Sequence, residues 1–388
     1  MKNQYNKTIT ACFIGYIVQA IVNNFVPLLF LTFQSEYGIP LEKITMLITI
    51  NFALQLCVDL LSVTFVDRIG YRASMLIAHV CAAAGLAMLA VLPGLFPDPF
   101  TGLLIAVVLY AVGGGLLEVL VSPVVEACPS DNKEKAMSML HSFYCWGYVG
   151  VVLFSTIFFK LFSVSNWKIL SLVWACVPAA NMILFTRVPV PHLIADGGKG
   201  MTLPELFKTK IFWLFMLLML CAGASEQAVS QWASAFAEKG LGINKTLGDL
   251  AGPMAFAVLM GTARLFYGRH GEKINLDKFM KASIVLCIAS YLCIGLVRIP
   301  AAGLVGCAFT GLSVGILWPG TFSKAAASIK RGGTSLFAFL ALAGDLGCSG
   351  GPTLVGIVSS VFSDNLRIGI LAAIIFPVLM LAGISKRK

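Results

Sequence analysis

The sequence predicts an all-α membrane protein in which twelve transmembrane helices form two pseudo-symmetric six-helix bundles. Of its 388 residues, 58% are hydrophobic and only 12% are charged. A soluble protein cannot bury that much apolar surface, so we expect the lipid bilayer to be its partner. The long apolar runs lack the period-two alternation that is typical of a membrane β-barrel.

The individual spans follow from apolar runs of about 20 residues, the length that a helix needs to cross a bilayer. The longest hydrophilic stretch, 187–210, is rich in Pro and Gly and is predicted to link an N-terminal bundle, 1–186, to a C-terminal bundle, 211–388. The predicted spans are centred near Ile21, Leu54, Ala84, Ala111, Val149, Cys176, Ala224, Ala257, Ala289, Ser313, Gly347 and Ile374.

The two halves also repeat each other. Gly147 and Gly150 of the fifth span align with Gly344 and Gly347 of the eleventh, and the turn at 35–38 aligns with the turn at 237–240. Two parallel repeats with a binding site at mid-membrane are typical of secondary transporters.

The formal net charge of +10 is a topology signal. Lys and Arg gather in alternate loops, which by the positive-inside rule puts both termini in the cytoplasm. As a transporter, the chain is expected in the inner (plasma) membrane. We therefore expect no nucleic-acid partner. The 11 cysteines occur without a C-x-x-C pair and are predicted to be reduced packing residues.

Glu118 lies in an otherwise apolar segment, 101–125. A carboxylate at that depth is costly unless it faces a cavity or a partner. Helical spacing places Tyr110, Gly114 and Glu118 on one face, so Tyr110 is a candidate substrate ligand together with Glu118. Glu118 could be neutralised by a neighbouring helix purely for packing, but we favour the interpretation that it lines a water-filled substrate path.

Other polar side chains in the N-terminal half are candidate substrate ligands. Asn23 and Asn24 in the first span and Gln55 in the second could bind a solute, although amides join helices in lipid as often as they bind ligands. In the fifth span, Tyr144 and Trp146 suit stacking on a sugar face, and they suit core packing equally well.

The seventh span is the most polar of the C-terminal half, with Glu226, Gln227, Gln231 and Trp232 within two turns. These residue types are too polar for a lipid-facing helix, so we expect them to line a cavity.

Three further residues of this half are also candidates. Trp318 is a candidate ligand in the tenth span, and Asp345 in the eleventh is either a coupling-ion ligand or the partner of an amide. Arg264 is expected to pair with Asp59 or Asp67.

The turn after the second span, Asp67-Arg68-Ile69-Gly70-Tyr71-Arg72, is either a solvated cytoplasmic turn or part of a gate. Asp67 could sit against the N-terminus of a helix that begins near Thr334 and hold one conformation shut. Asp67, Arg68 and Arg72 are the candidate gating residues.

Enzyme signals are weak. Gly311-Leu312-Ser313-Val314-Gly315 matches a nucleophile pattern, but it lies within a span, where small residues four apart are typical of helix packing. No H-E-x-x-H metal motif or phosphate-binding loop occurs in the sequence, so we expect no enzyme activity, metal or other cofactor. Transport energy would then come from an ion gradient or from the solute's own gradient.

Over essentially its whole length the sequence resembles the major facilitator superfamily, through the turn Asp67 to Arg72, although Val63 stands where a Gly is usual upstream. It further resembles the fucose permease-like sugar/proton symporters. That second resemblance rests on Asn23-Asn24 with the turn at Gly38, on Leu117-Glu118 with Ser122-Pro123, and on the segment from Phe143 to Gly147.

The resemblance implies a two-bundle fold with alternating access and a role for Glu118 in sugar and proton handling. Two departures bear on this: Pro27 stands where the fucose permease has its first-span acid, and Ser122 where an Asn is usual. The candidates for proton coupling are therefore Glu118, Glu226 and Asp345; coupling could have moved to Glu226 or Asp345, or be absent. The main hypothesis is a monomeric proton symporter of a small polar solute, a sugar or sugar derivative. The alternatives are a drug or metabolite exporter of the same fold and a membrane sensor.

Overall fold

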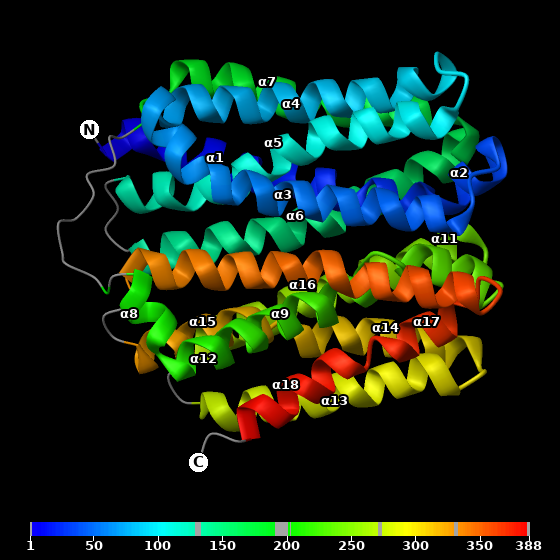
Figure 1. Ribbon diagram of the computed structural model, residues 1–388. Helices are drawn as coiled ribbons and strands as arrows, with labels where there is room; N and C mark the ends of the chain where they lie inside the picture. Colours follow the sequence, from blue (N-terminus) through cyan, green and yellow to red (C-terminus); the bar gives the residue numbers. More distant parts are fainter. Residues whose placement is uncertain are drawn as a thin grey trace. The chain divides into compact units, whose positions relative to one another are not determined.

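The computed structural model describes residues 2–128, 133–190, 201, 203–270, 274–329 and 333–385. Every regular element of these residues is a helix (Figure 1). Twelve of the helical segments described are long and apolar enough to cross a membrane, and each contains one of the predicted span centres. The all-α, twelve-span prediction is therefore confirmed. The chain divides into two compact units, Met1–Ala195 and Asp196–Lys388, which are described in turn.

Unit 1 holds the first six spans. The third to sixth spans are α4, α5, α6 and α7, and the first is divided between α1, η1 and α2. The elements of this unit are α1 (Lys2–Asn24), η1 (Val26–Leu29), α2 (Phe30–Tyr37), α3 (Leu41–Ile69), α4 (Tyr71–Val91), η2 (Leu92–Gly94), α5 (Pro99–Ala127), α6 (Lys133–Phe162), η3 (Val164–Asn166) and α7 (Trp167–Arg187).

The first span is interrupted where Pro27 enters the chain. Pro has no N–H to donate to the preceding turn, so α1 ends at Asn24 and a short 3-10 turn, η1, follows. The span then ends at Gly38, whose φ of 65° is readily adopted only by Gly. The interruption lies directly after the polar residues Asn23 and Asn24.

Helix α5 lies against α4 through glycines. A methyl group on Gly113 would lie 2.6 Å from the carbonyl oxygen of Ala78, and one on Gly85 would lie 2.7 Å from Cβ of Tyr110. Without a hydrophobic effect between helices in lipid, such close backbone approach is what holds neighbouring spans together. This packing fixes the rotation of α5, the helix that carries Glu118.

Unit 2 holds the last six spans. Its elements are α8 (Leu203–Lys208), α9 (Lys210–Ser230), α10 (Ala233–Ala235), η4 (Phe236–Gly240), α11 (Lys245–Asp249), η5 (Leu250–Met254), α12 (Ala255–His270), α13 (Leu276–Leu296), α14 (Pro300–Val314), α15 (Leu317–Ser328), α16 (Gly333–Val361), α17 (Leu366–Ala372) and α18 (Ile375–Ser385).

The seventh span is interrupted too, like the first. It leaves α-helical geometry at Gln231 and Trp232 and continues through α10 into the π-helical turn η4. A second π-helical turn, η5, lies in the eighth span and contains Pro253. Because π-helical turns are rare and concentrate at functional sites, this pair of spans is a natural place to look for one.

Helices α9 and α16 pack with their backbones in contact. A methyl group on Gly347 would overlap the carbonyl oxygen of Leu220, and one on Gly351 would overlap that of Ala224. The two helices can approach this closely only because Gly occupies these positions. The packing brings Asp345 on α16 and Glu226 on α9 into one helix pair.

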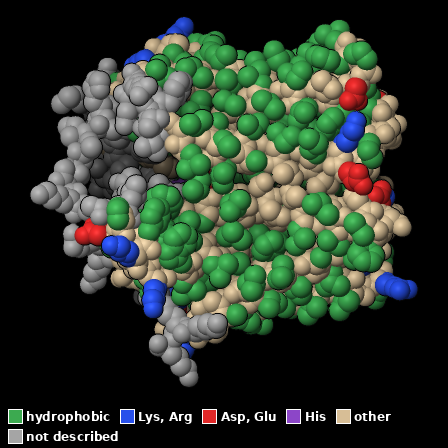
Figure 2. Space-filling model, viewed as in Figure 1, with side chains coloured by type: hydrophobic (Ala, Val, Ile, Leu, Met, Phe, Trp, Pro, Cys, Tyr) green, Lys and Arg blue, Asp and Glu red, His purple; other side chains and the backbone are tan. Residues whose placement is uncertain are grey.

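The outer surface suits a hydrocarbon environment. In Figure 2 hydrophobic side chains cover the middle of the visible face, and the Lys, Arg, Asp and Glu side chains on that face lie towards its two ends. Leu161 and Val361, at 70% and 74% exposure, belong to this apolar surface. A bilayer solvates such side chains, whereas water would not.

Candidate functional site: polar networks inside the spans

The centre of unit 1 contains a buried network of three amides. Asn23 on α1 accepts a hydrogen bond through Oδ1 from Nε2 of Gln55 at 2.8 Å and another from Nδ2 of Asn51 at 3.3 Å. All three side chains are at most 5% exposed. The predicted ligands Asn23 and Gln55 are thus brought together. Asn51 was not predicted, although its position one turn before Gln55 on α3 is a signal that could have identified it.

Two glycines of α5 make room for this network. A methyl group on Gly115 would lie 3.0 Å from Cα of Gln55, and one on Gly114 would lie 3.0 Å from a methyl of Val22 on α1. Since both distances are shorter than ordinary van der Waals contact, even a methyl group at these positions would press against α1 and α3, and larger side chains would push α5 away from them. The glycine stretch therefore holds three helices close enough for their polar groups to meet.

Glu118 extends the polar surface along α5. Its Oε2 accepts a hydrogen bond from Nε2 of Gln19 on α1 at 2.7 Å, and Glu118 is only partly buried. One turn further on, the hydroxyls of Ser122 and Tyr16 lie 2.9 Å apart. Glu118 is thus a carboxylate held in place by an uncharged amide, and Gln19 is a site residue that the prediction of ligands did not include.

The predicted aromatic ligands of unit 1 are placed differently from one another. The hydroxyl of Tyr144 on α6 accepts a long hydrogen bond of 3.4 Å from Nδ2 of Asn24, and that amide also donates to the carbonyl oxygen of Ala20. Trp146 is 44% exposed, and Tyr110 is 2% exposed and lies against α4. Tyr144 and Asn24 are therefore paired, whereas Tyr110 and Trp146 lie apart from this pair.

Arg72, a candidate gating residue, fastens the beginning of α4 to the end of α7. Its Nη1 donates to the carbonyl oxygens of Phe185 and Thr186, at 3.2 and 3.0 Å, and its Nη2 donates to that of Val188 at 2.7 Å. A cation here satisfies carbonyls left free at a helix C-terminus. The side chains of Asp67 and Arg68 lie outside the described residues.

Unit 2 contains a second polar network, built on α9. Oε1 of Glu226 accepts from Nε2 of Gln227 at 3.3 Å, and Oε1 of Gln227 accepts from Nε2 of Gln231 at 2.9 Å. Nη2 of Arg264 on α12 lies 3.4 Å from Oε2 of Glu226. Glu226, Gln227 and Gln231 are therefore linked to one another. Within unit 2 they meet Arg264, a cation that the sequence had suggested would pair with Asp59 or Asp67.

The remaining candidates of unit 2 lie on or against α16. Trp232 is fully buried and its Nε1 donates to the carbonyl oxygen of Pro352 at 3.0 Å, so its indole N–H binds the protein itself. A methyl group on Gly344 would overlap the ring of Trp318. Asp345, the next residue, is 5% exposed. Trp318 thus packs against the turn of α16 that carries Asp345.

The Gly311–Gly315 motif is part of the helix packing. A methyl group on Gly311 would overlap the carbonyl oxygen of Phe256 on α12, and one on Gly315 would lie 2.9 Å from that of Met260. Ser313 is 1% exposed and donates to the carbonyl oxygen of Thr310 within α14 at 2.7 Å. Its hydroxyl is engaged in a local helix contact, as is common for Ser in transmembrane helices.

Polar networks buried on interrupted, membrane-length helices are a feature of transporters. A family model of the Major Facilitator Superfamily matches residues 11–352. The chain belongs to the Major Facilitator Superfamily. The family and the twelve apolar helices together make it an integral, multi-pass membrane protein with a transporter fold. No curated protein sequence matches it.

Solved structures show the same superfamily fold at low sequence identity. The fucose:proton symporter of E. coli is 15% identical, with a TM-score of 0.68 over 99% of each chain. The xylose transporter of E. coli is 12% identical, with a TM-score of 0.81 over 99% of this chain and 98% of that one. A bacterial homologue of the human lysosomal transporter Spinster is 14% identical, with a TM-score of 0.78 over 100% and 97%.

Proposed function

We propose that this superfamily member carries a small polar solute, a sugar or sugar derivative, across the inner membrane together with protons, as a monomer with both termini in the cytoplasm. The observation that carries the proposal is a pair of contacts inside spans of unit 1: the part-buried bond between Gln19 and Glu118 and the buried bond between Asn23 and Gln55. Amide and carboxylate groups offer both donors and acceptors, which is what a solute rich in hydroxyls needs. Two of the fold neighbours, a fucose:proton symporter and a xylose transporter, act on sugars.

Glu118 is the carboxylate that we assign to proton coupling. When ionised it accepts the hydrogen bond from Nε2 of Gln19. When protonated it becomes a donor as well, and Oε1 of Gln19, which is buried and has no hydrogen-bond partner among the described residues, is then an available acceptor. By turning its amide, Gln19 can serve both protonation states. A carboxylate supported in both states is suited to cycle between them.

Glu226 has a different neighbourhood, because the guanidinium of Arg264 lies beside it. We propose that Glu226, Gln227 and Gln231 bind solute hydroxyls and that Asp345 is a further carboxylate of the path. Loss of the negative charge at Glu226 leaves the partly buried Arg264 with less compensation, which is costly. Glu226→Gln should therefore impair solute binding and folding more than Glu118→Gln does.

The test is uptake into proteoliposomes of neutral monosaccharides, sugar acids and nucleosides, with and without an imposed pH gradient. Glu118→Gln should abolish accumulation driven by the gradient while counterflow, the exchange of labelled for unlabelled solute, continues. Glu42→Gln, an exposed Glu at the start of α3, is the matched control and should behave as the wild type. Undiminished gradient-driven uptake in Glu118→Gln would refute the assigned role.

The alternative of a drug or metabolite exporter has one supporting observation, the fold shared with the Spinster homologue. An exporter of amphipathic compounds would accumulate a cationic dye inside inside-out vesicles when a pH gradient is applied, because the lumen of such a vesicle corresponds to the outside of the cell. The amide networks favour a hydroxylated solute instead, since they present hydrogen-bonding groups rather than apolar surface. Dye export without any monosaccharide uptake would replace the symporter proposal.

A further inference from the structure

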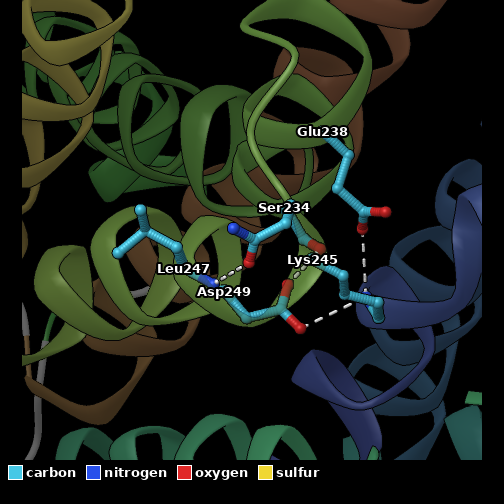
Figure 3. Close-up of polar contacts among 6 residues, drawn as sticks. Ser234, Glu238, Lys245, Leu247 and Asp249 are labelled. Atoms are coloured by element: carbon cyan, nitrogen blue, oxygen red, sulfur yellow. Dashed lines mark hydrogen bonds and ion pairs between the residues drawn. The ribbon is translucent and has the colours of Figure 1, made fainter. Parts of the chain in front are cut away.

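The end of the seventh span is held by a polar cluster that the proposed solute contacts do not use. We call it the 234–249 cluster and define it as Ser234, Glu238, Lys245 and Asp249 (Figure 3). The hydroxyl of Ser234 donates to Oδ1 of Asp249 at 2.5 Å. Nζ of Lys245 lies 3.2 Å from Oδ2 of Asp249 and 3.2 Å from Oε1 of Glu238. One lysine thus joins two carboxylates that come from different spans.

The carboxylate at the centre of the cluster is buried, where burial of charge is expensive. Asp249 is fully buried and Ser234 is 2% exposed, whereas the side chains of Lys245 and Glu238 are partly exposed, at 18% and 22%. Side chains of apolar residues would fill the same space without the cost of removing an ion pair from water. A buried ion pair is therefore poor evidence for stability alone, and its presence is better explained by a requirement for one specific geometry.

The backbone around the cluster gives that requirement a physical reason. Residues 231–254 contain the break at Gln231 and Trp232, the short helix α10 and the π-helical turns η4 and η5. Such segments lack the continuous hydrogen-bond ladder that keeps an α-helix straight. Ser234 lies two residues after Trp232, so its bond to Asp249 fixes the segment close to the point where the ladder is interrupted.

Unit 1 also carries a fastened carboxylate at the repeat-related position, although its partner span differs. The end of its interrupted first span carries Glu36, which accepts a hydrogen bond from Nε1 of Trp167 at 2.7 Å and lies 3.0 Å from Nζ of Lys168. Glu36 aligns with Glu238 in the internal repeat. In each unit, therefore, a carboxylate fastens the end of an interrupted span, in unit 1 to the start of the sixth span and in unit 2 to the start of the eighth.

We propose that Asp249, through Ser234 and Lys245, is a positioning residue for transport: it holds the segment after the break in place, and with it Gln231 and Trp232. This inference rests on the proposed function, because Gln231 is assigned there to the solute. Trp232 is tied to α16 through Pro352, so the break has one fixed side. The 234–249 cluster supplies the other. Loosening it should weaken solute binding, although none of its members is assigned to the solute.

The test uses Ser234→Ala, because Asp249→Ala could fail to fold. Ser290→Ala is the matched control: Ser290 is also buried, in the same unit, and it donates only within its own helix, to the carbonyl oxygen of Leu286. Two quantities are measured, hydrogen–deuterium exchange of residues 231–240 and the KM and Vmax of neutral monosaccharide uptake. A second pair, Lys245→Met and Lys245→Arg, asks whether a cation restores what the apolar side chain removes.

The expected result for Ser234→Ala is faster exchange confined to residues 231–240 and a KM raised about fivefold with Vmax retained, the size of effect expected from one hydrogen bond. Ser290→Ala should change neither quantity. Lys245→Met should raise the KM, and Lys245→Arg, which keeps the cation, should bring the KM most of the way back to the wild-type value. Unchanged exchange at 231–240 would overturn the fastening role. Faster exchange with an unchanged KM would overturn the positioning role.

The proposed function is judged separately in the same experiment. If the wild-type protein takes up no monosaccharide, the sugar assignment fails before any variant is compared. The exchange data then still decide whether Ser234 and Asp249 hold the segment. The failure of the inference and the failure of the proposed function thus have different signatures.

Discussion

Replacement of Gly347 by Ala tests the packing that places the polar network of unit 2. The added methyl group would overlap the carbonyl oxygen of Leu220 and would lie 2.9 Å from the backbone nitrogen of Ala224. Both obstacles are backbone atoms, so the helices α9 and α16 must separate to admit it. Overpacking of this kind costs about 1–3 kcal/mol. At about 2–4 °C per kcal/mol for a unit of this size, the melting temperature should fall by several degrees.

Gly350→Ala is the control on the same helix. Nothing lies within 4 Å of a methyl group built at Gly350. Because Ala is a better helix former than Gly, this variant should be neutral or stabilised by up to about 1 kcal/mol. Melting is followed in detergent for the wild type and both variants under one scan rate. Equal melting temperatures for Gly347→Ala and Gly350→Ala would refute the inferred contact between the two helices.

Three further predictions follow from single contacts. Burial, aided by the nearby charge of Asp249 and opposed by Lys245, raises the pKa of Glu238, so the folded protein keeps this proton where the unfolded chain has lost it. The free energy of unfolding should therefore fall as the pH rises from the ordinary Glu range through the raised pKa. Glu238→Gln lacks this titration, so its melting temperature relative to that of the wild type should increase with pH. A difference in melting temperature that does not change with pH would contradict this. Arg72→Ala removes hydrogen bonds to three carbonyls at the end of α7 and should lower the free energy of unfolding by about 1–3 kcal/mol, as followed by melting. Arg72→Lys should lower it by less, and an unchanged stability of Arg72→Ala would contradict the contact. Asn23→Ala removes the acceptor for two amides and should raise the KM for monosaccharide at least as much as it lowers Vmax; an unchanged KM would argue against solute contact here.

The spans could be predicted from the sequence because hydropathy depends on local composition, and all of the predicted centres lie within the twelve candidate spans of the described residues. The break in the seventh span could not. The first span is interrupted next to Pro27, whose effect is local. The seventh has no Pro at its break, and its geometry depends on contacts such as Trp232 to Pro352 and Ser234 to Asp249. Contacts between residues far apart in sequence leave no local pattern.

The candidate site was predicted in its residue types and only partly in its pairings. Glu118 stands out as an acid among apolar neighbours, but its contact with Gln19 joins two spans and has no spacing signature. Tyr110, Gly114 and Glu118 share a face only approximately, because four residues turn an α-helix about 40° beyond a full rotation. Over eight residues this drift lets Tyr110 meet α4 while Glu118 meets α1.

The measurement that tests the account most directly is proton movement caused by the solute. A pH-sensitive dye is enclosed in proteoliposomes without an imposed gradient, and the monosaccharide taken up by the wild type is added outside. The account predicts acidification of the interior with the wild-type protein and none with Glu118→Gln, although counterflow persists in that variant. Equal acidification with both proteins, or solute entry without any proton movement in the wild type, would contradict it.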